Sequence, residues 1–194
     1  MNTREKLLNT SLQLFSRLGY SGTSIRKIAK ETGIRESAIY NHFPSKKEIF
    51  IHTQKLFLRN FNDSSVFTDD LLNNLSNPFK FLTDVITELV KKWETNESKL
   101  SLKLLLLSQD ELEDIPVISI KERLDDSKAI WKMIFGELIK AGYVKEIDLD
   151  QLVNQFYNPL FTLRIQYLNM NSDSFLEEAK SHLDFFWNAV KSEA

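Results

Sequence analysis

The sequence predicts an all-α protein, with a three-helix head that contains a helix-turn-helix and a following helical bundle, about nine helices in total. Two observations support this class. The 194 residues include only 5 Gly and 4 Pro, and apolar residues recur at three- and four-residue spacing in successive segments. The chain has no Cys, which excludes disulfides and cysteine-ligated zinc.

The first expected helix runs from Thr3 to Leu18. Asn2 and Glu5 have the spacing of a capping box, and Gly19 is a typical residue for ending a helix. Its apolar stripe predicts a core-forming helix.

Two shorter helices follow, and together they have the pattern of a helix-turn-helix. Ser24 is the expected N-cap of the second helix, and Gly33 is expected to end it. The third helix is expected over 35–43, with an inward face of Ala38, Ile39 and Phe43. Two helices this short bury little by themselves, so they need the first helix to present the third to the major groove of DNA.

The outer face of the third helix has side chains that suit DNA. Arg35 can pair with guanine, Asn41 can pair with adenine, and the Ala38 methyl group can touch thymine. Glu36 must face a cytosine amine, pair with a neighbouring cation or lie clear of the groove. The side chains that suit phosphate oxygens are those of Ser24, Tyr40, His42 and Lys46. The alternative is an ordinary polar helix surface.

The charge of the chain is divided unevenly. Residues 1–50 hold nine Lys/Arg and four Asp/Glu, a net charge of +5, whereas residues 51–194 hold sixteen and twenty-three, a net charge of −7. A basic head on an acidic body indicates that the head faces phosphate.

The stretch TSIRKIAKETGIRESAIYNHFPSKKE, which begins at Thr23, resembles the N-terminal signature of the TetR family of bacterial transcriptional regulators. The resemblance covers about a quarter of the chain. It implies an all-helical homodimer with a DNA-reading head and a variable C-terminal domain that binds an effector. By position it implies DNA contacts at Ser24, Arg26, Ser37, Tyr40, His42 and Lys46. It assigns the choice of operator sequence to Arg35, Glu36 and Asn41.

The remaining helices are bounded by local signals. The expected segments are a helix from a capping box at Ser45–Glu48 to about Asn62, a loop over 63–77, a helix opened by Pro78, a buried helix over 100–107, a segment from Pro116 to Lys140, a helix capped by Asp148, and a last helix from Ser174 to about Val190. Pro159 is expected to kink or split the helix that contains it.

The expected domains are a DNA-binding domain over 1–47 and an effector-binding and dimerisation domain over 48–194. The helix after Asp148 has almost no polar face in the sequence. This predicts a homodimer through the last two helices, with a fully internal helix as the alternative.

The 14 Phe and 3 Trp favour an effector pocket between helices. Its candidate lining residues are Phe57, Phe61, Trp93, Trp131, Phe135 and Phe161, each of which can instead be ordinary core. No catalytic, cofactor or metal site is expected, since Glu48/His52 and Glu178/His182 lack further ligands and are interpreted as surface helix pairs. The acidic run 110–114 is interpreted as a solvated helix end or loop.

The sequence therefore predicts a cytoplasmic, ligand-responsive repressor and neither an enzyme nor a membrane protein. It would bind a palindromic double-stranded DNA operator as a homodimer and leave it when a small apolar or aromatic effector binds. One alternative is a DNA-binding regulator or activator without an effector. The other is an all-helical ligand-binding module.

Overall fold

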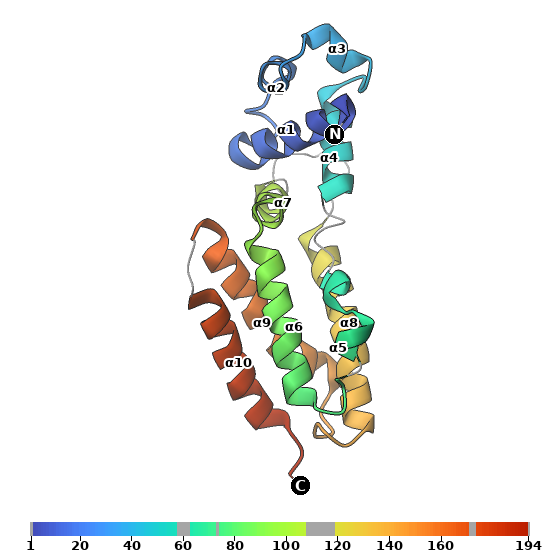
Figure 1. Ribbon diagram of the computed structural model, residues 1–194, viewed down its shortest axis with the longest axis vertical. Helices are drawn as coiled ribbons and strands as arrows, with labels where there is room; N and C mark the ends of the chain where they lie inside the picture. Colours follow the sequence, from blue (N-terminus) through green and yellow to red (C-terminus); the bar gives the residue numbers. More distant parts are fainter. Residues whose placement is uncertain (1, 58–62, 73, 108–118, 171–173, 194) are drawn as a thin grey trace. The chain divides into compact units, whose positions relative to one another are not determined.

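The computed structural model describes residues 2–57, 63–72, 74–107, 119–170 and 174–193. Within these ranges the named secondary-structure elements are all α-helices or 3-10 helices (Figure 1). One isolated antiparallel bridge joins Val144 to Lys191. The predicted all-α class is confirmed. The chain forms two compact units: unit 1 comprises 1–61 with 96–123, and unit 2 comprises 62–95 with 124–194. The functional boundary expected at residue 47 stays a prediction.

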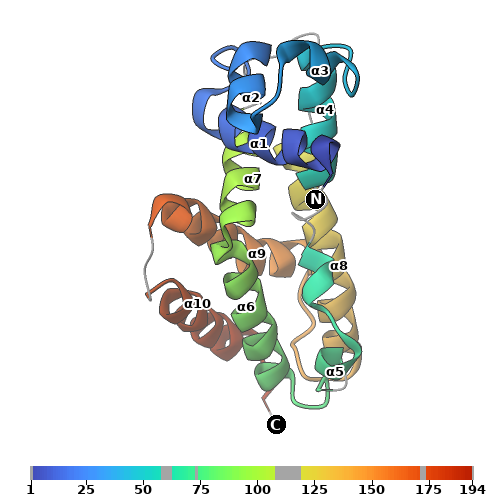
Figure 2. The same ribbon diagram turned by 45° about the horizontal axis from the view of Figure 1, so that its top comes forward.

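Unit 1 contains the head helices. Its elements are α1 (Thr3–Leu18), α2 (Ile25–Thr32), α3 (Glu36–Tyr40), α4 (Lys46–Phe57) and α7 (Asn96–Leu107). Helix α1 packs against α2, α4 and α7, as Figure 2 shows. The core of this unit includes Leu7, Leu8, Phe15, Ile28, Ile39, Phe43, Phe50 and Leu104. Because α7 supplies Leu104, this core draws on a helix well beyond the first three.

The local signals of the head act as predicted. Asn2 and Glu5 form the reciprocal capping box of α1, and the Ser24 hydroxyl accepts a hydrogen bond from the Lys27 amide at 3.2 Å. Gly33 ends α2 with φ +77°, a left-handed conformation that favours glycine.

Helix α3 is shorter than the expected 35–43. It spans only Glu36–Tyr40, with Arg35 as N-cap and a turn after it. The amides of His42 and Phe43 both donate to the Ile39 oxygen at 2.9 Å. Because Phe43 precedes Pro44, its backbone is biased away from the α region, which ends the helix early.

Lys46 ties the start of α4 to the turn between α1 and α2. Its Nζ donates hydrogen bonds to the backbone oxygens of Tyr20 and Thr23, each at 2.9 Å. The same Nζ lies 3.9 Å from the centroid of the Tyr20 ring, which packs edge-on against Phe50 at 5.1 Å. Charge-assisted hydrogen bonds and a cation–π contact therefore hold together the elements that flank α2 and α3.

Unit 2 is a bundle around an aromatic core. Its elements are η2 (Asp63–Val66), α5 (Asp69–Leu72), α6 (Pro78–Glu94), the part of α8 (Ile120–Lys140) from Leu124 onward, α9 (Leu149–Gln166), η3 (Tyr167–Asn169) and α10 (Ser174–Val190). Helix α10 packs against α6 and α9. The ring centroids of Trp131 and Phe156 lie 4.5 Å apart, and those of Phe135 and Phe186 lie 5.6 Å apart. These rings connect α8, α9 and α10.

Two predictions about unit 2 are wrong. The segment 63–77 was expected to be a loop, but it contains the helical turns η2 and α5, and η2 buries Asp63 and Val66. Helix α9 was expected to lack a polar face. Most of its apolar residues are buried, although Ile165 is 38% exposed, and the helix carries an exposed polar stripe made of Gln151, Gln155, Asn158, Thr162 and Gln166. Helix α9 also continues through Pro159 without splitting.

His182 connects α10 to α9. Its Nε2 lies 3.0 Å from the Phe156 oxygen, so the neutral ring can donate a hydrogen bond to it. Burial lowers the pKa of His182 below its ordinary value of 6.5, and the bond to Phe156 opposes that shift. The expected pairing of Glu178 with His182 is not formed, because Glu178 accepts a hydrogen bond from Tyr167 instead. The other expected pair is present, with His52 Nδ1 3.6 Å from Glu48.

We expect Lys46→Ala to destabilise the protein by about 1–2 kcal/mol, because two charged hydrogen bonds and a ring contact are lost. Thermal melting checks this. Lys30→Ala, which removes an exposed lysine from α2, is the matched control and should change the melting temperature little. Equal melting temperatures for the two variants would contradict the role assigned to Lys46.

We expect acidification to destabilise the protein partly through His182. Because its folded pKa lies below the ordinary value, its contribution is complete above about pH 6.5 and is lost as the pH falls toward the folded pKa. The His182→Gln variant should lose less stability than the wild-type chain between about pH 7.5 and pH 5.5. Urea unfolding at each pH measures this, with His42→Gln, at an exposed position, as control. An unchanged pH slope in the His182 variant would refute the assignment.

Candidate nucleic-acid interface

The candidate DNA-binding surface consists of the exposed side chains of α3 and its flanking turns. Ile39 and Phe43 are buried, and they anchor the segment from one side. The exposed side chains are those of Arg35, Glu36, Ser37, Tyr40, Asn41 and His42. All six predicted DNA-binding residues of this segment are thus exposed to solvent, and their contact with DNA stays a prediction. Tyr40 is 56% exposed, high for an aromatic residue of a short helix.

Helix α2 adds two predicted contacts. Ser24 caps the helix with its hydroxyl oxygen, and the hydroxyl hydrogen can still be donated to an acceptor. Arg26 is exposed one residue into the helix proper. The neighbouring Lys27 instead donates its Nζ to the Gly22 oxygen at 2.8 Å. Residues at the start of α2 therefore combine a local structural role with accessible donors.

Lys46 differs from the other predicted DNA-binding residues. Its ammonium is half-buried and donates to two backbone oxygens. This geometry gives Lys46 a positioning role within the head. A contact between Lys46 and phosphate stays a prediction.

Arg4 is a cation near α3 whose position follows only from the fold. Its guanidinium carbon lies 4.8 Å from the centroid of the Phe43 ring, and the residue is exposed. The start of α1 therefore contacts the turn that follows α3. From the sequence, Arg4 could equally reach a phosphate or lie on a solvated surface, and its contact with Phe43 could not be predicted because the two residues are 39 positions apart along the chain.

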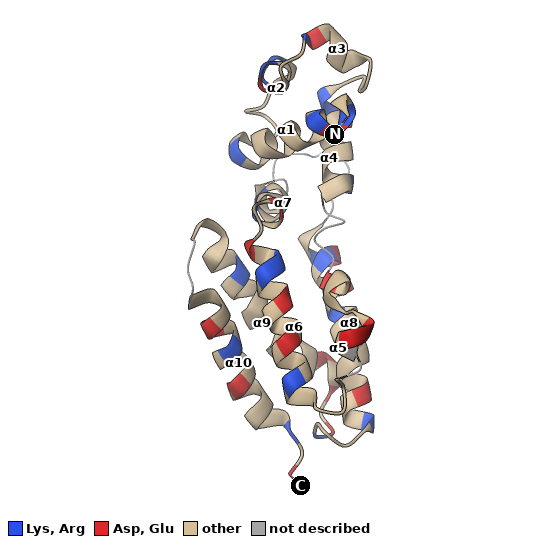
Figure 3. Cartoon of the chain, in the orientation of Figure 1, with Lys and Arg blue, Asp and Glu red and all other residues tan. Residues whose placement is uncertain are grey.

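The cations of the head gather around these elements. Figure 3 shows Lys and Arg on α1 and α2, before α3 and at the start of α4. The N-terminal 50 residues carry a net charge of +5. A surface of this kind attracts a polyanion over a distance set by ionic strength.

The predicted effector-binding aromatics lie mainly in the core. Phe57 is buried in unit 1, whereas Trp93, Trp131, Phe135 and Phe161 are buried in unit 2. Phe61 lies outside the described residues, as does the acidic run 110–114. These aromatic side chains do not line the grooves described below, and their contact with an effector stays a prediction.

The described ranges contain no group of three or more His, Cys, Asp or Glu residues placed to hold a metal ion. None of the helices in this part of the chain is both long enough and apolar enough to span a membrane.

Sequence comparisons agree with this geometry. Residues 7–53 match the model of the family described as bacterial regulatory proteins, tetR family. Over 90 residues the chain is 32% identical to IcaR of Staphylococcus aureus, the HTH-type negative transcriptional regulator of the icaADBC biofilm operon, which covers 42% of this chain and 47% of IcaR. It is 46% identical to the HTH-type regulator AcrR of Shigella flexneri over 48 residues, which covers 25% of this chain and 22% of AcrR. The matches thus span about half or less of these relatives.

Solved structures extend the likeness to the whole fold. A TetR-family regulator from Mesorhizobium loti superposes with a TM-score of 0.72 at 16% identity, covering 97% of this chain and 96% of that one. The ketosteroid regulator KstR2 of Mycobacterium tuberculosis gives 0.71 at 19% identity, covering 99% and 96%. Residues 7–53 therefore match the model of the tetR family, and the whole chain shares its fold with a solved tetR-family regulator.

Proposed function

We propose that the chain is a DNA-binding transcriptional regulator that reads its operator with α3. The observation that carries this proposal is the surface formed by Arg35, Ser37, Tyr40 and Asn41, which is exposed on a segment anchored by buried Ile39. Guanidinium and amide groups can each make two hydrogen bonds to a base edge, whereas hydroxyl groups suit phosphate. IcaR is a negative regulator, which favours repression as the direction of control.

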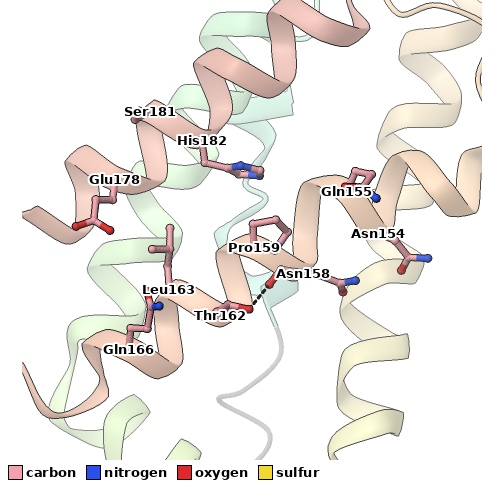
Figure 4. Close-up of a pocket in the computed structure, with 10 residues that line it drawn as sticks. All are labelled: Asn154, Gln155, Asn158, Pro159, Thr162, Leu163, Gln166, Glu178, Ser181 and His182. Atoms are coloured by element: carbon pink, nitrogen blue, oxygen red, sulfur yellow. Dashed lines mark hydrogen bonds between the residues drawn. The ribbon is translucent and has the colours of Figure 1, made fainter.

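The same proposal includes a homodimer formed through α9 and α10. Two adjoining grooves of 580 and 450 Å³ lie along these helices. Figure 4 shows the first groove, which is lined by Glu178, Ser181 and His182 of α10 and by residues of α9, with the His182 ring pointing toward α9. The exposed stripe of α9 carries amide and hydroxyl side chains without a charge, and depletion of charge is typical of buried interface centres.

Phe185 provides the apolar part of this surface. It is 78% exposed on α10 and lines the second groove with Leu152, Phe186 and Ala189. A large aromatic side chain of this kind is typical of an interface anchor. A two-fold dimer would place two copies of α3 on a palindromic operator, with half-sites about one helical turn apart.

Control by a small effector completes the proposal. Unit 2 is rich in buried aromatic side chains, and its fold is shared with KstR2, which is named for ketosteroids. Binding of an effector would favour a dimer whose reading heads no longer match successive major grooves, and the operator would be released. A regulator without an effector would show no ligand-dependent change in operator affinity.

We expect Arg35→Ala to weaken binding to the operator by about tenfold or more, since loss of a two-bond base contact costs roughly 1–3 kcal/mol. Binding to a scrambled duplex should change much less, so the variant should lose specificity. Fluorescence anisotropy with both duplexes measures this. Lys55→Ala removes the same charge from an exposed position on α4 and serves as control. If both variants bind alike, Arg35 does not read a base.

We expect Phe185→Glu to convert the dimer to a monomer, because it places a charge at the centre of the proposed interface. Sedimentation velocity gives the oligomeric state directly. Met133→Glu is the matched control, since Met133 is 65% exposed on α8 and outside this surface. A dimer that survives Phe185→Glu, or a monomeric wild-type chain, would overturn the proposed interface.

A further inference from the structure

Unit 2 contains a fully buried carboxylate that the proposed function does not use. Asp63, the first residue of η2, is 1% exposed. Its Oδ1 accepts a hydrogen bond from Trp93 Nε1 at 3.1 Å, and its Oδ2 accepts one from the Tyr157 hydroxyl at 2.8 Å. Burying a carboxylate is costly unless donors replace its water. The donors around Asp63 therefore form a ready-made carboxylate site.

Two cations also act on this carboxylate. Arg164 is 3% exposed, and its guanidinium carbon lies 5.0 Å from the centroid of the Trp93 ring. Burial lowers the pKa of Arg164 and of Lys92, and the negative charge of Asp63 opposes both shifts. Arg164 stays charged at neutral pH because the ordinary pKa of arginine is so high. The negative charge of one carboxylate thus stabilises two positive groups.

Tyr157 remains a donor over the whole physiological pH range. Burial raises the pKa of Tyr157 well above 10, and the nearby Asp63 raises it further. The phenol therefore keeps its proton and donates a hydrogen bond to a carboxylate oxygen. With Trp93 on the other oxygen, the two neutral donors match the two oxygens of a carboxylate.

An open groove lies on the surface of unit 2 and is lined by Lys92. It has a volume of 860 Å³ and lies between the η2–α5 segment and α6. Lys92 lines the groove and donates its Nζ to the Ser65 hydroxyl at 2.7 Å, and it also interacts electrostatically with Asp63. Val66 and Leu71 give the groove an apolar wall. A ligand in the groove would meet a cation at one end and apolar side chains beside it.

The acidic residues of the groove do not oppose such a ligand strongly. Asp84 pairs with Lys80 at 2.5 Å, and Glu88 pairs with Lys91 at 2.7 Å. Their charges are thus balanced locally, and Lys92 faces the groove beside a neutral hydroxyl. The groove therefore favours an anion at the Lys92 end.

We propose that unit 2 binds an organic acid in this groove, where the ligand carboxylate pairs with Lys92 and competes with Asp63 for the charge of that lysine. This inference rests on the proposed function, since it names the chemical class of the effector. Asp63 is the protein's own carboxylate that interacts with Lys92.

The first test asks whether the donors bind a free carboxylate once Asp63 is removed. Asp63→Ala should melt below the wild-type chain, and acetate should raise its melting temperature by ~3 °C or more relative to chloride at equal ionic strength. The wild-type chain and Asp84→Ala, which both keep Asp63, should respond to acetate much less than Asp63→Ala. Equal melting temperatures of Asp63→Ala in acetate and chloride would overturn the proposal.

The second test uses the wild-type chain without DNA and also decides the matter if Asp63→Ala does not fold. Benzoate should raise the melting temperature and speed amide exchange of residues 63–66, whereas the neutral isostere benzamide should do neither. Lys92→Gln should abolish the response, and Lys140→Gln, at an exposed position outside the groove, should keep it. A response to benzamide or inorganic phosphate equal to that of benzoate, or no response at all, would refute an organic-acid site.

These measurements separate this inference from the proposed function. A benzoate response in a chain that binds no operator would leave the acid site standing and remove the regulator. Operator binding without any benzoate response would do the reverse.

Discussion

Helix α3 is too short to be stable by itself, and the structure of the head follows from that constraint. Helix α3 has only five residues, of which Ile39 is the buried one. An isolated helix of this length is not stable in water. Its position therefore depends on the core of α1, α2, α4 and α7, and on Lys46, which joins α4 to the α1–α2 turn. The exposed polar residues can face a groove only because these neighbours hold the backbone.

In unit 2, Asp63 joins distant elements through side-chain hydrogen bonds, much as Lys46 does in the head. Its carboxylate connects η2 to Trp93 of α6 and to Tyr157 of α9. Removing such an acceptor would leave buried donors unsatisfied, so the cluster holds three elements in one arrangement. A hydrogen-bonded group that an external ligand can imitate is also a natural point of control, because the ligand and the internal group exclude each other.

The head could be predicted closely because its boundaries depend on signals within a few residues. Asn2 with Glu5, Ser24 and Gly33 act through caps and turns that the local sequence specifies. The length of α3 was overestimated. The helix was expected to continue to Phe43, next to Pro44, but it ends at Tyr40. The candidate DNA-binding residues of α3 follow from the same short-range pattern.

The features that the sequence did not predict join distant parts of the chain. Lys46 contacts the turn 23 and 26 positions before it, and Asp63 contacts a tyrosine 94 positions after it. The polar face of α9 was missed because its apolar residues dominate the sequence, and only the fold shows which of them are covered. Such pairings depend on tertiary packing and have no local signature.

Binding of the wild-type chain to DNA from upstream of its own gene, measured as a function of salt, tests the central claim most directly. If α2 and α3 neutralise several phosphates, the logarithm of the affinity should fall linearly with the logarithm of the salt concentration. The loss should be on the order of 10³-fold between about 50 and 200 mM salt. Absent binding, or an affinity that does not change with salt, would contradict a DNA-reading head.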